Sequence, residues 1–138
     1  MEIPECFYRV SAKALVLNET RDKFLLCKEE DGRWDLPGGG LDFGTTPQED
    51  LPREIAEEMG LPVAYIADYP CYFLTEKMSG REAWRALVLY ETKLGHLNFT
   101  PSDECIEVRF VSPKDIEELT VYTGVSILAT MFKPENHI

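Results

Sequence analysis

A glycine-rich turn that leads into a capped, amphipathic helix is the feature that most constrains this chain. Residues 38–40 are three consecutive glycines, which interrupt regular structure and let backbone groups approach a ligand closely. Thr46-Pro47-Gln48-Glu49 has the form of a capping box with proline at the first helical position. An apolar residue then recurs every fourth position before a glycine stop: Leu51, Ile55, Met59 and Gly60. The segment predicts a helix that packs against a core by this apolar stripe.

Pro52 is an awkward residue for this helix, because it lacks an amide hydrogen and crowds the preceding turn. Two alternatives follow: the helix is kinked at Pro52, or it begins near Asp50 and the turn at Thr46 is separate. Under both alternatives the residues after Pro52 are helical.

Three glutamates share one face of the expected helix. With Glu54 as the reference and ~100° per residue, Glu58 lies about 40° to one side and Glu57 about 60° to the other. Arg53 precedes Glu57 by four residues and can hold its rotamer. Glu58 borders the apolar stripe, so its carboxylate should be partly shielded from water. Such runs are also common on solvated helices, but repulsion between three anions beside a core favours a bound Mg²⁺, Mn²⁺ or Ca²⁺.

Composition excludes several other classes of function. A chain of 138 residues is the length of one domain, and its net charge of −11 argues against duplex nucleic acid as a partner. No apolar run approaches the ~20 residues needed to span a bilayer. The N-terminus shows no basic region followed by an apolar run, so we expect no signal peptide and a cytoplasmic location.

The four cysteines lie far apart and form no C-x-x-C pair, which argues against a zinc cluster or a disulfide scaffold. We interpret them as small buried hydrophobic residues. They are Cys6, Cys27, Cys71 and Cys105.

Alternating or short apolar runs predict strands on both sides of the helix. These strands fall in residues 8–17, 23–28, 33–36, 63–75, 81–93 and 104–111. A short helix is expected from Ser112 and an apolar one over Ser126 to Phe132, with a loose tail from Lys133. This order predicts a single domain, residues 1–138, in which helices cover a mixed sheet.

Gly39 and the run Arg53-Glu54-Ile55-Ala56-Glu57-Glu58-Met59-Gly60-Leu61 resemble the Nudix box of MutT-like Nudix hydrolases. The segment from Trp34 to Gly39 resembles the usual lead-in, and Glu104 to Phe110 resembles a later family strand that carries another acid. One box position departs from the pattern, because Thr45 stands where the first Glu is expected. The acids near enough in sequence to compensate are Asp42, Glu49 and Asp50.

The resemblance implies an α/β fold, an α/β/α sandwich around a mixed β-sheet. It also implies roles in metal binding, with Mg²⁺ expected and Mn²⁺ as a substitute. The metal ligands would be Glu54, Glu57, Glu58 and the Gly38 carbonyl. Arg53 would orient the glutamates, and Glu104 would act as a further ligand or as the base. The glycine turn (Gly38, Gly39 and Gly40) would contact the substrate.

The resemblance further implies hydrolysis of a diphosphate linkage by a metal-activated water. The substrate would be a nucleoside diphosphate linked to another group, or a nucleoside triphosphate. A Nudix-fold module that binds a nucleotide or metabolite with weak or no hydrolysis is the alternative. Aromatic residues such as Trp34 could stack on a base, although such residues are more often core.

Substrate identity stays open, because specificity would depend on loops outside the box, in residues 70–81 and 95–103. Four basic residues can hold a terminal phosphate, although each is more often solvated surface: Arg9, Lys13, Arg81 and Arg85. His96 and His137 are assigned no chemistry. The sequence also leaves the oligomeric state open, with a homodimer as one option.

Overall fold

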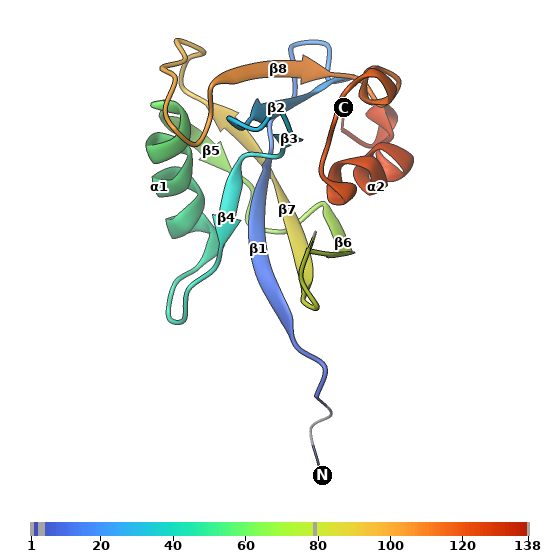
Figure 1. Ribbon diagram of the computed structural model, residues 1–138. Coiled ribbons are helices and arrows are strands. Elements are labelled where there is room, and N and C mark those ends of the chain that lie inside the picture. Colours follow the sequence, from blue (N-terminus) through green and yellow to red (C-terminus); the bar gives the residue numbers. More distant parts are fainter. Residues whose placement is uncertain (1, 3–4, 79, 138) are drawn as a thin grey trace.

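The computed structural model describes residues 2, 5–78 and 80–137, and within them the chain forms two sheets and two α-helices (Figure 1). The strands are β1 (Tyr8–Leu15), β2 (Phe24–Lys28), β3 (Trp34–Asp35), β4 (Gly38–Gly40), β5 (Val63–Ile66), β6 (Tyr72–Lys77), β7 (Trp84–Leu94) and β8 (Glu107–Val111). The helices are α1 (Pro47–Met59) and α2 (Thr123–Met131), with short 3-10 turns at Asp115–Glu118 and Pro134–His137.

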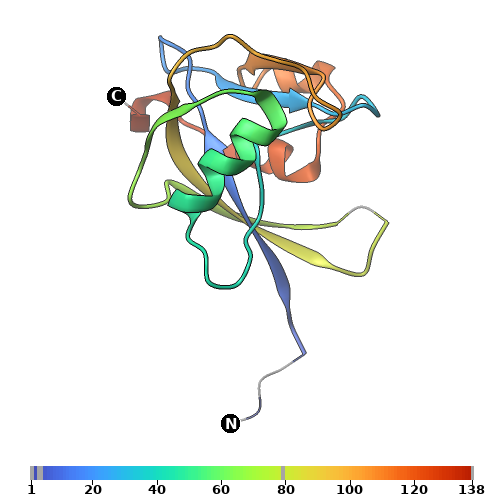
Figure 2. The same ribbon diagram turned by 90° about the vertical axis from the view of Figure 1, so that its left-hand side faces the viewer.

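The larger sheet has the order β4-β1-β7-β5, and β6 also pairs with β7. Strands β1 and β7 run parallel over eight residue pairs, whereas the other pairings are antiparallel, so the sheet is mixed. The smaller sheet has the order β3-β2-β8. Helices α1 and α2 lie on opposite sides of these strands (Figures 1 and 2). This arrangement confirms the predicted α/β/α sandwich around a mixed sheet.

Strand β1 is the central strand, and its second half is buried on both faces. Ala12 and Ala14 point to the core that packs against α1, whereas Lys13 and Leu15 point to the opposite side. The α1 core also contains the apolar stripe of the helix, as its periodicity predicts. A charged residue in the middle of a doubly buried strand therefore has to find its partners inside the protein.

Helix α1 is one continuous element, despite Pro52. Thr46 caps it by accepting a hydrogen bond from the amide of Glu49 at 3.3 Å, and its hydroxyl donates to the Glu49 carboxylate at 3.2 Å. The helix therefore does not begin near Asp50. It ends where Gly60, in the left-handed conformation, donates from its amide to the carbonyl of Ala56.

Three sequence-based expectations need correction. Residues 38–40 do not interrupt the sheet but form β4, which pairs with β1. Helix α2 begins at Thr123, three positions earlier than predicted. The tail from Lys133 is not loose, because His137 is buried, stacks on Phe132 and lies 2.6 Å from the Tyr72 hydroxyl through its Nε2 atom. An aromatic partner distant in sequence holds the tail, and local patterning does not reveal such a partner.

The cysteines divide into two pairs. Cys27 and Cys105 are buried as expected, whereas Cys6 and Cys71 are exposed, and all four are free thiols. In the segments that the structure describes, no helix is long and apolar enough to cross a membrane.

The attachment of α1 can be tested with Ile55→Ala. The Ile55 side chain is fully buried between the helix and β1, so its truncation should lower the free energy of unfolding by about 2–5 kcal/mol. Leu97→Ala is the control, since Leu97 is 58% exposed and its truncation should cost no more than about 0.5 kcal/mol. Chemical denaturation measures both. Equal stabilities of the two variants would contradict the described packing.

Candidate active site

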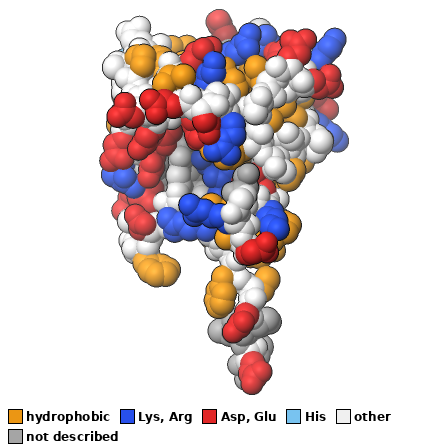
Figure 3. All heavy atoms as spheres, viewed as in Figure 1, with side chains coloured by type: hydrophobic (Ala, Val, Ile, Leu, Met, Phe, Trp, Pro, Cys, Tyr) orange, Lys and Arg blue, Asp and Glu red, His pale blue; other side chains and the backbone are white. Residues whose placement is uncertain are grey.

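A cavity of about 550 Å³ lies between the face of α1 that carries Glu54 and Glu58, the glycine turn, which forms β4, and the smaller sheet. Its lining is strongly acidic. The charged residues there are Lys13, Glu29, Glu30, Asp31, Asp35, Glu54, Glu58, Asp103 and Glu104. Figure 3 shows acidic side chains gathered over the α1 side of the molecule. We call this cavity the acidic pocket.

The glycine turn brings α1 close to β1. A Cβ atom at Gly38 would lie 2.3 Å from the Ala12 carbonyl oxygen, and Gly38 has a φ of +127°, so only glycine fits there. A Cβ atom at Gly39 would lie 3.0 Å from the Glu54 carboxylate. The glycines therefore leave room for the Glu54 side chain against the turn. Their role is to shape the pocket, and of the three only Gly38 lines it among the described residues.

Lys13 forms the floor of the pocket and joins the two sheets. Its Nζ atom donates to Asp35 of β3 at 3.2 Å, and to the carbonyls of Leu36 at 3.1 Å and Gly38 at 3.3 Å. The side chain is only 5% exposed. Sequence analysis interpreted Lys13 as surface more readily than as a buried group. Its position between Ala12 and Ala14, in the run of small and apolar residues that ends the strand, was the signal that could have identified it.

Glu58 lies at the inner end of the acidic face and is 8% exposed. Burial raises the pKa of Glu58 to about 8, Lys13 opposes this shift, and the carboxylates of Glu54 and Glu104 add to it. The hydroxyl of Ser102 donates to the Glu58 carbonyl at 2.6 Å and accepts from the Glu104 amide at 3.2 Å, so it holds the segment before β8 against α1. Three acids from two distant segments thus face one cavity.

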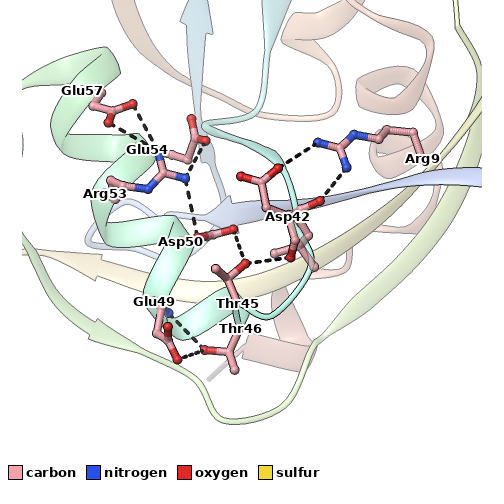
Figure 4. A network of polar contacts seen from close by, with 10 residues as sticks. Arg9, Asp42, Thr45, Thr46, Glu49, Asp50, Arg53, Glu54 and Glu57 are labelled. Carbon is pink, nitrogen blue, oxygen red and sulfur yellow. Dashed lines mark hydrogen bonds and ion pairs between the residues drawn. The ribbon is translucent and has the colours of Figure 1, made fainter.

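A polar network supports α1 at the position where the Nudix box lacks its first Glu (Figure 4). The Thr45 hydroxyl donates to Asp50 at 2.9 Å, and the other carboxylate oxygen of Asp50 lies 3.5 Å from Arg53. Arg53 also contacts Glu54 at 3.2 Å and Glu57 at 3.3 Å. Of the three acids expected to compensate, Asp50 is the one that contacts Arg53. The other two are engaged elsewhere, Glu49 with Thr46 and Asp42 with Arg9.

Five of the predicted site residues do not line the acidic pocket: Gly39, Gly40, Trp34, Arg53 and Glu57. Glu57 is 58% exposed and points toward Arg53, so its role as a metal ligand remains a prediction. Trp34 is 4% exposed and packs in the core beside α2. This burial leaves too little free ring surface for stacking on a base, which corrects the expectation of substrate contact. Gly40 is covered by Arg9, because a Cβ atom there would overlap its guanidinium.

The donor set suits a hard divalent cation. Glu54, Glu58 and Glu104 supply carboxylate oxygens, and the Gly38 carbonyl oxygen faces the same space. Oxygen ligands of this kind match Mg²⁺ or Mn²⁺, and a cation would favour the ionised form of Glu58, whose pKa is raised by burial and by the neighbouring carboxylates. Within the described residues, no three acidic, histidine or cysteine side chains already stand close enough together to form a complete shell. Binding would therefore draw the carboxylates together.

Comparison with known proteins agrees with this geometry. The model of the NUDIX domain matches residues 7–129. A protein of Bacillus subtilis (strain 168) named "Putative 8-oxo-dGTP diphosphatase" is 38% identical over 65 residues, which are 47% of this chain and 44% of that protein. The chain thus spans less than half the length of this relative.

Two further relatives are matched over most of their length. An RNA pyrophosphohydrolase of Zymomonas mobilis subsp. mobilis is 26% identical over 133 residues, with 83% of this chain and 85% of that protein covered. The crystal structure of a MutT protein from Methanosarcina mazei Go1 superposes with a TM-score of 0.69 at 26% identity, covering 97% of this chain and 99% of that one.

The raised pKa of Glu58 predicts a pH-dependent gain in stability from Glu58→Gln. In the unfolded chain this carboxyl ionises near its usual pKa of 4.5, but in the metal-free native protein only near 8. The native state therefore holds the proton longer, and its stability falls as the pH rises from about 4.5 to about 8. In EDTA at pH 7.5, Glu58→Gln should be more stable than wild type by about 1–4 kcal/mol.

Denaturant unfolding at pH 5 and pH 7.5 measures this difference, which should shrink at pH 5. Glu57→Gln is the matched control, since Glu57 is exposed and should show little change at either pH. A Glu58→Gln variant less stable than wild type at pH 7.5 would show that Glu58 is not held in a destabilising position.

Proposed function

The chain belongs to the Nudix family, and we propose that it is a metal-dependent hydrolase of diphosphate linkages in nucleotides. The observation that carries this proposal is the acidic pocket, in which Glu54 and Glu58 of α1 face Glu104 across a cavity floored by Lys13. The pocket combines oxygen donors for a cation with room for a phosphate chain. A cytoplasmic location remains a prediction.

We assign the following roles to the residues of the pocket. Glu54, Glu58 and the Gly38 carbonyl hold the ion, and Glu57 joins them if its side chain turns from Arg53. When bound, Mg²⁺ or Mn²⁺ supplies positive charge that activates a water and stabilises the phosphate oxygens. Arg53 and Asp50 fix the rotamers of the helix glutamates. Lys13 places one positive charge at the floor, which attracts a phosphate group, while its three N–H groups are taken by Asp35, Leu36 and Gly38.

The reaction adds water to one phosphorus of the diphosphate and breaks the bridging P–O bond, which releases the other phosphate as the leaving group. A carboxylate has to accept the proton of the attacking water. A nearby cation lowers the pKa of Glu58, so that Glu58 stays ionised as a ligand. We assign the role of proton acceptor to Glu104, which lies at the exposed rim of the pocket and close enough to Glu58 to raise its pKa.

The substrate class is a nucleoside diphosphate linked to another group or a nucleoside triphosphate. The names of the matched relatives, an 8-oxo-dGTP diphosphatase and an RNA pyrophosphohydrolase, support a substrate in which a nucleotide carries a phosphoanhydride. Neither name is carried over to this chain, because only 44% of the first relative is covered and the second is 26% identical.

A binding module without turnover is the second candidate function. The observation in its favour is Thr45, which stands at the box position where Glu is expected. The contact from Thr45 to Asp50 and from Asp50 to Arg53 weakens this argument, because an acid still supports Arg53.

A hydrolysis screen decides between the two functions. With Mg²⁺ present, sugar nucleotides, dinucleoside polyphosphates, nucleoside triphosphates and ADP-ribose are incubated with wild type and with Glu58→Gln, and release of phosphate-bearing products is measured. We expect turnover of at least one class, and a fall in kcat of about 10²-fold or more in the variant, since it loses an ionised ligand.

Glu117→Gln is the control for loss of one negative charge, because Glu117 is exposed in the Asp115–Glu118 turn and does not line the acidic pocket. Its activity should equal that of wild type. Absence of turnover on every substrate, or equal activity of wild type and Glu58→Gln, would refute the catalytic proposal.

A further inference from the structure

A second cavity, of about 280 Å³, has four cations and one acid among its lining residues, although the chain as a whole carries a net charge of −11. Its basic residues are Arg33, Lys77, Arg81 and Arg85, and they come from three separate segments of the chain. One carboxylate, Glu76 of β6, also lines it. We call this cavity the basic pocket. Figure 3 shows basic side chains gathered near the middle of the face, beside the acidic region over α1.

The charge of Glu76 is already compensated. One of its carboxylate oxygens accepts from Arg85 Nε at 2.8 Å, and the other accepts from the amide of Gly124 in the first turn of α2. The Glu76 side chain is 3% exposed, so it does not present its charge to the pocket. Arg85 is therefore committed to Glu76, whereas Arg33, Lys77 and Arg81 remain at the surface of the cavity.

The acids that contact these surface cations compete only weakly with an anionic ligand for them. Arg33 contacts Asp31 at 2.8 Å and Lys77 contacts Glu82 at 3.5 Å, but both acids are well exposed to solvent. Arg81 forms no ion pair with any residue that the structure describes. An anion that enters the cavity can therefore gain charge-assisted hydrogen bonds without breaking a buried ion pair.

Arg33 is held in a fixed position at the edge of the cavity. Its guanidinium lies 4.3 Å from the centre of the Tyr122 ring, a cation–π contact. The Tyr122 amide donates to the Trp34 carbonyl at 3.1 Å, which ties this ring to β3. A guanidinium ordered in this way offers a planar fork suited to a phosphate or a carboxylate.

The basic and acidic pockets are adjacent, because three pairs of contacting residues join the lining of one to the lining of the other. In the first pair, Asp31 lines the acidic pocket and its partner Arg33 lines the basic pocket. Asp35 lines the acidic pocket and lies 3.6 Å from Arg85, which lines the basic pocket. Glu29 lines the acidic pocket and accepts a 2.6 Å hydrogen bond from the Tyr122 hydroxyl, whose residue lines the basic pocket. One extended ligand can therefore reach both cavities.

From this geometry we propose that the basic pocket binds a second anionic group of the substrate, a phosphate or a carboxylate remote from the cleaved linkage. The inference rests on the proposed function, since it takes the diphosphate to lie in the acidic pocket. The preferred substrate is then a diphosphate that carries a further negative charge, with Arg33, Arg81 and Lys77 as its specificity-determining residues. A neutral group would gain no charge-assisted hydrogen bond from these cations.

A titration with inorganic phosphate tests the anion site without any turnover. In EDTA the acidic pocket repels anions, so phosphate should shift the amide resonances around Tyr122 and residues 76–85. Arg33→Gln and Arg81→Gln should each weaken binding about tenfold, because each removes a charge-assisted hydrogen bond. Arg109→Gln, on the exposed part of β8, is the matched control and should leave the affinity unchanged.

Two results of this titration would overturn the proposal. One is the absence of shifts in these segments, and the other is an affinity that is the same in Arg33→Gln, Arg81→Gln and wild type. Both are independent of hydrolysis, so they remain distinct from a failure of the proposed function in the substrate screen.

Hydrolysis rates of substrate pairs that differ in one anionic group show which group occupies the basic pocket. Diphosphates that differ by one phosphate monoester are compared, such as coenzyme A with 3′-dephospho-coenzyme A and NADPH with NADH. In wild type, at least one pair should show a kcat/KM about tenfold higher for the more anionic member, mainly through KM. Arg81→Gln should abolish the preference. Equal kcat/KM values within every hydrolysed pair would contradict the proposal.

Discussion

The ammonium group of Lys13 holds the two sheets together at the point where the acidic pocket forms. It projects from the doubly buried strand β1 and reaches Asp35 of the smaller sheet and the carbonyls on either side of Pro37. A buried ion pair of this kind is costly to break, about 3–5 kcal/mol, because the remaining charge has no water to replace its partner. The contact fixes the glycine turn, and the turn in turn leaves room for Glu54. The same cation partly offsets the acids above it.

The acidic face of α1 lowers the stability of the metal-free protein, and the proposed binding of a cation explains why the chain carries it. Glu58 sits beside the apolar stripe of its own helix, with Glu54 one turn before it and Glu104 across the cavity, and burial together with these carboxylates raises its pKa to about 8. A protein selected for stability alone would place a neutral side chain there. Arg53 limits this cost by contacting Glu54 and Glu57, and the buried Asp50, which accepts from Thr45, holds Arg53 in place (Figure 4). The departure from the Nudix box therefore leaves Arg53 supported by a neighbouring acid.

Sequence predicted the parts that depend on local periodicity and on the box. The cap at Thr46, the stripe through Ile55 and the shared face of Glu54 and Glu58 all follow from residues within one helix. Contacts between segments that are distant in the sequence could not be predicted from local patterns. The burial of Lys13 and of His137 depends on partners 22 and 65 residues away. The role of Trp34 was equally unpredictable from sequence. An aromatic residue beside the box can stack on a base or fill a core, and the packing of α2 shows that Trp34 fills the core.

The central claim is that a divalent cation binds between the acids of the pocket, and anomalous scattering from crystals grown with Mn²⁺ tests it most directly. We predict a manganese peak coordinated by Glu54 and Glu58, within reach of Glu104 and the Gly38 carbonyl, and no peak in crystals of Glu58→Gln. A peak bound elsewhere in wild type, or one that persists in the pocket of the variant, would contradict this account.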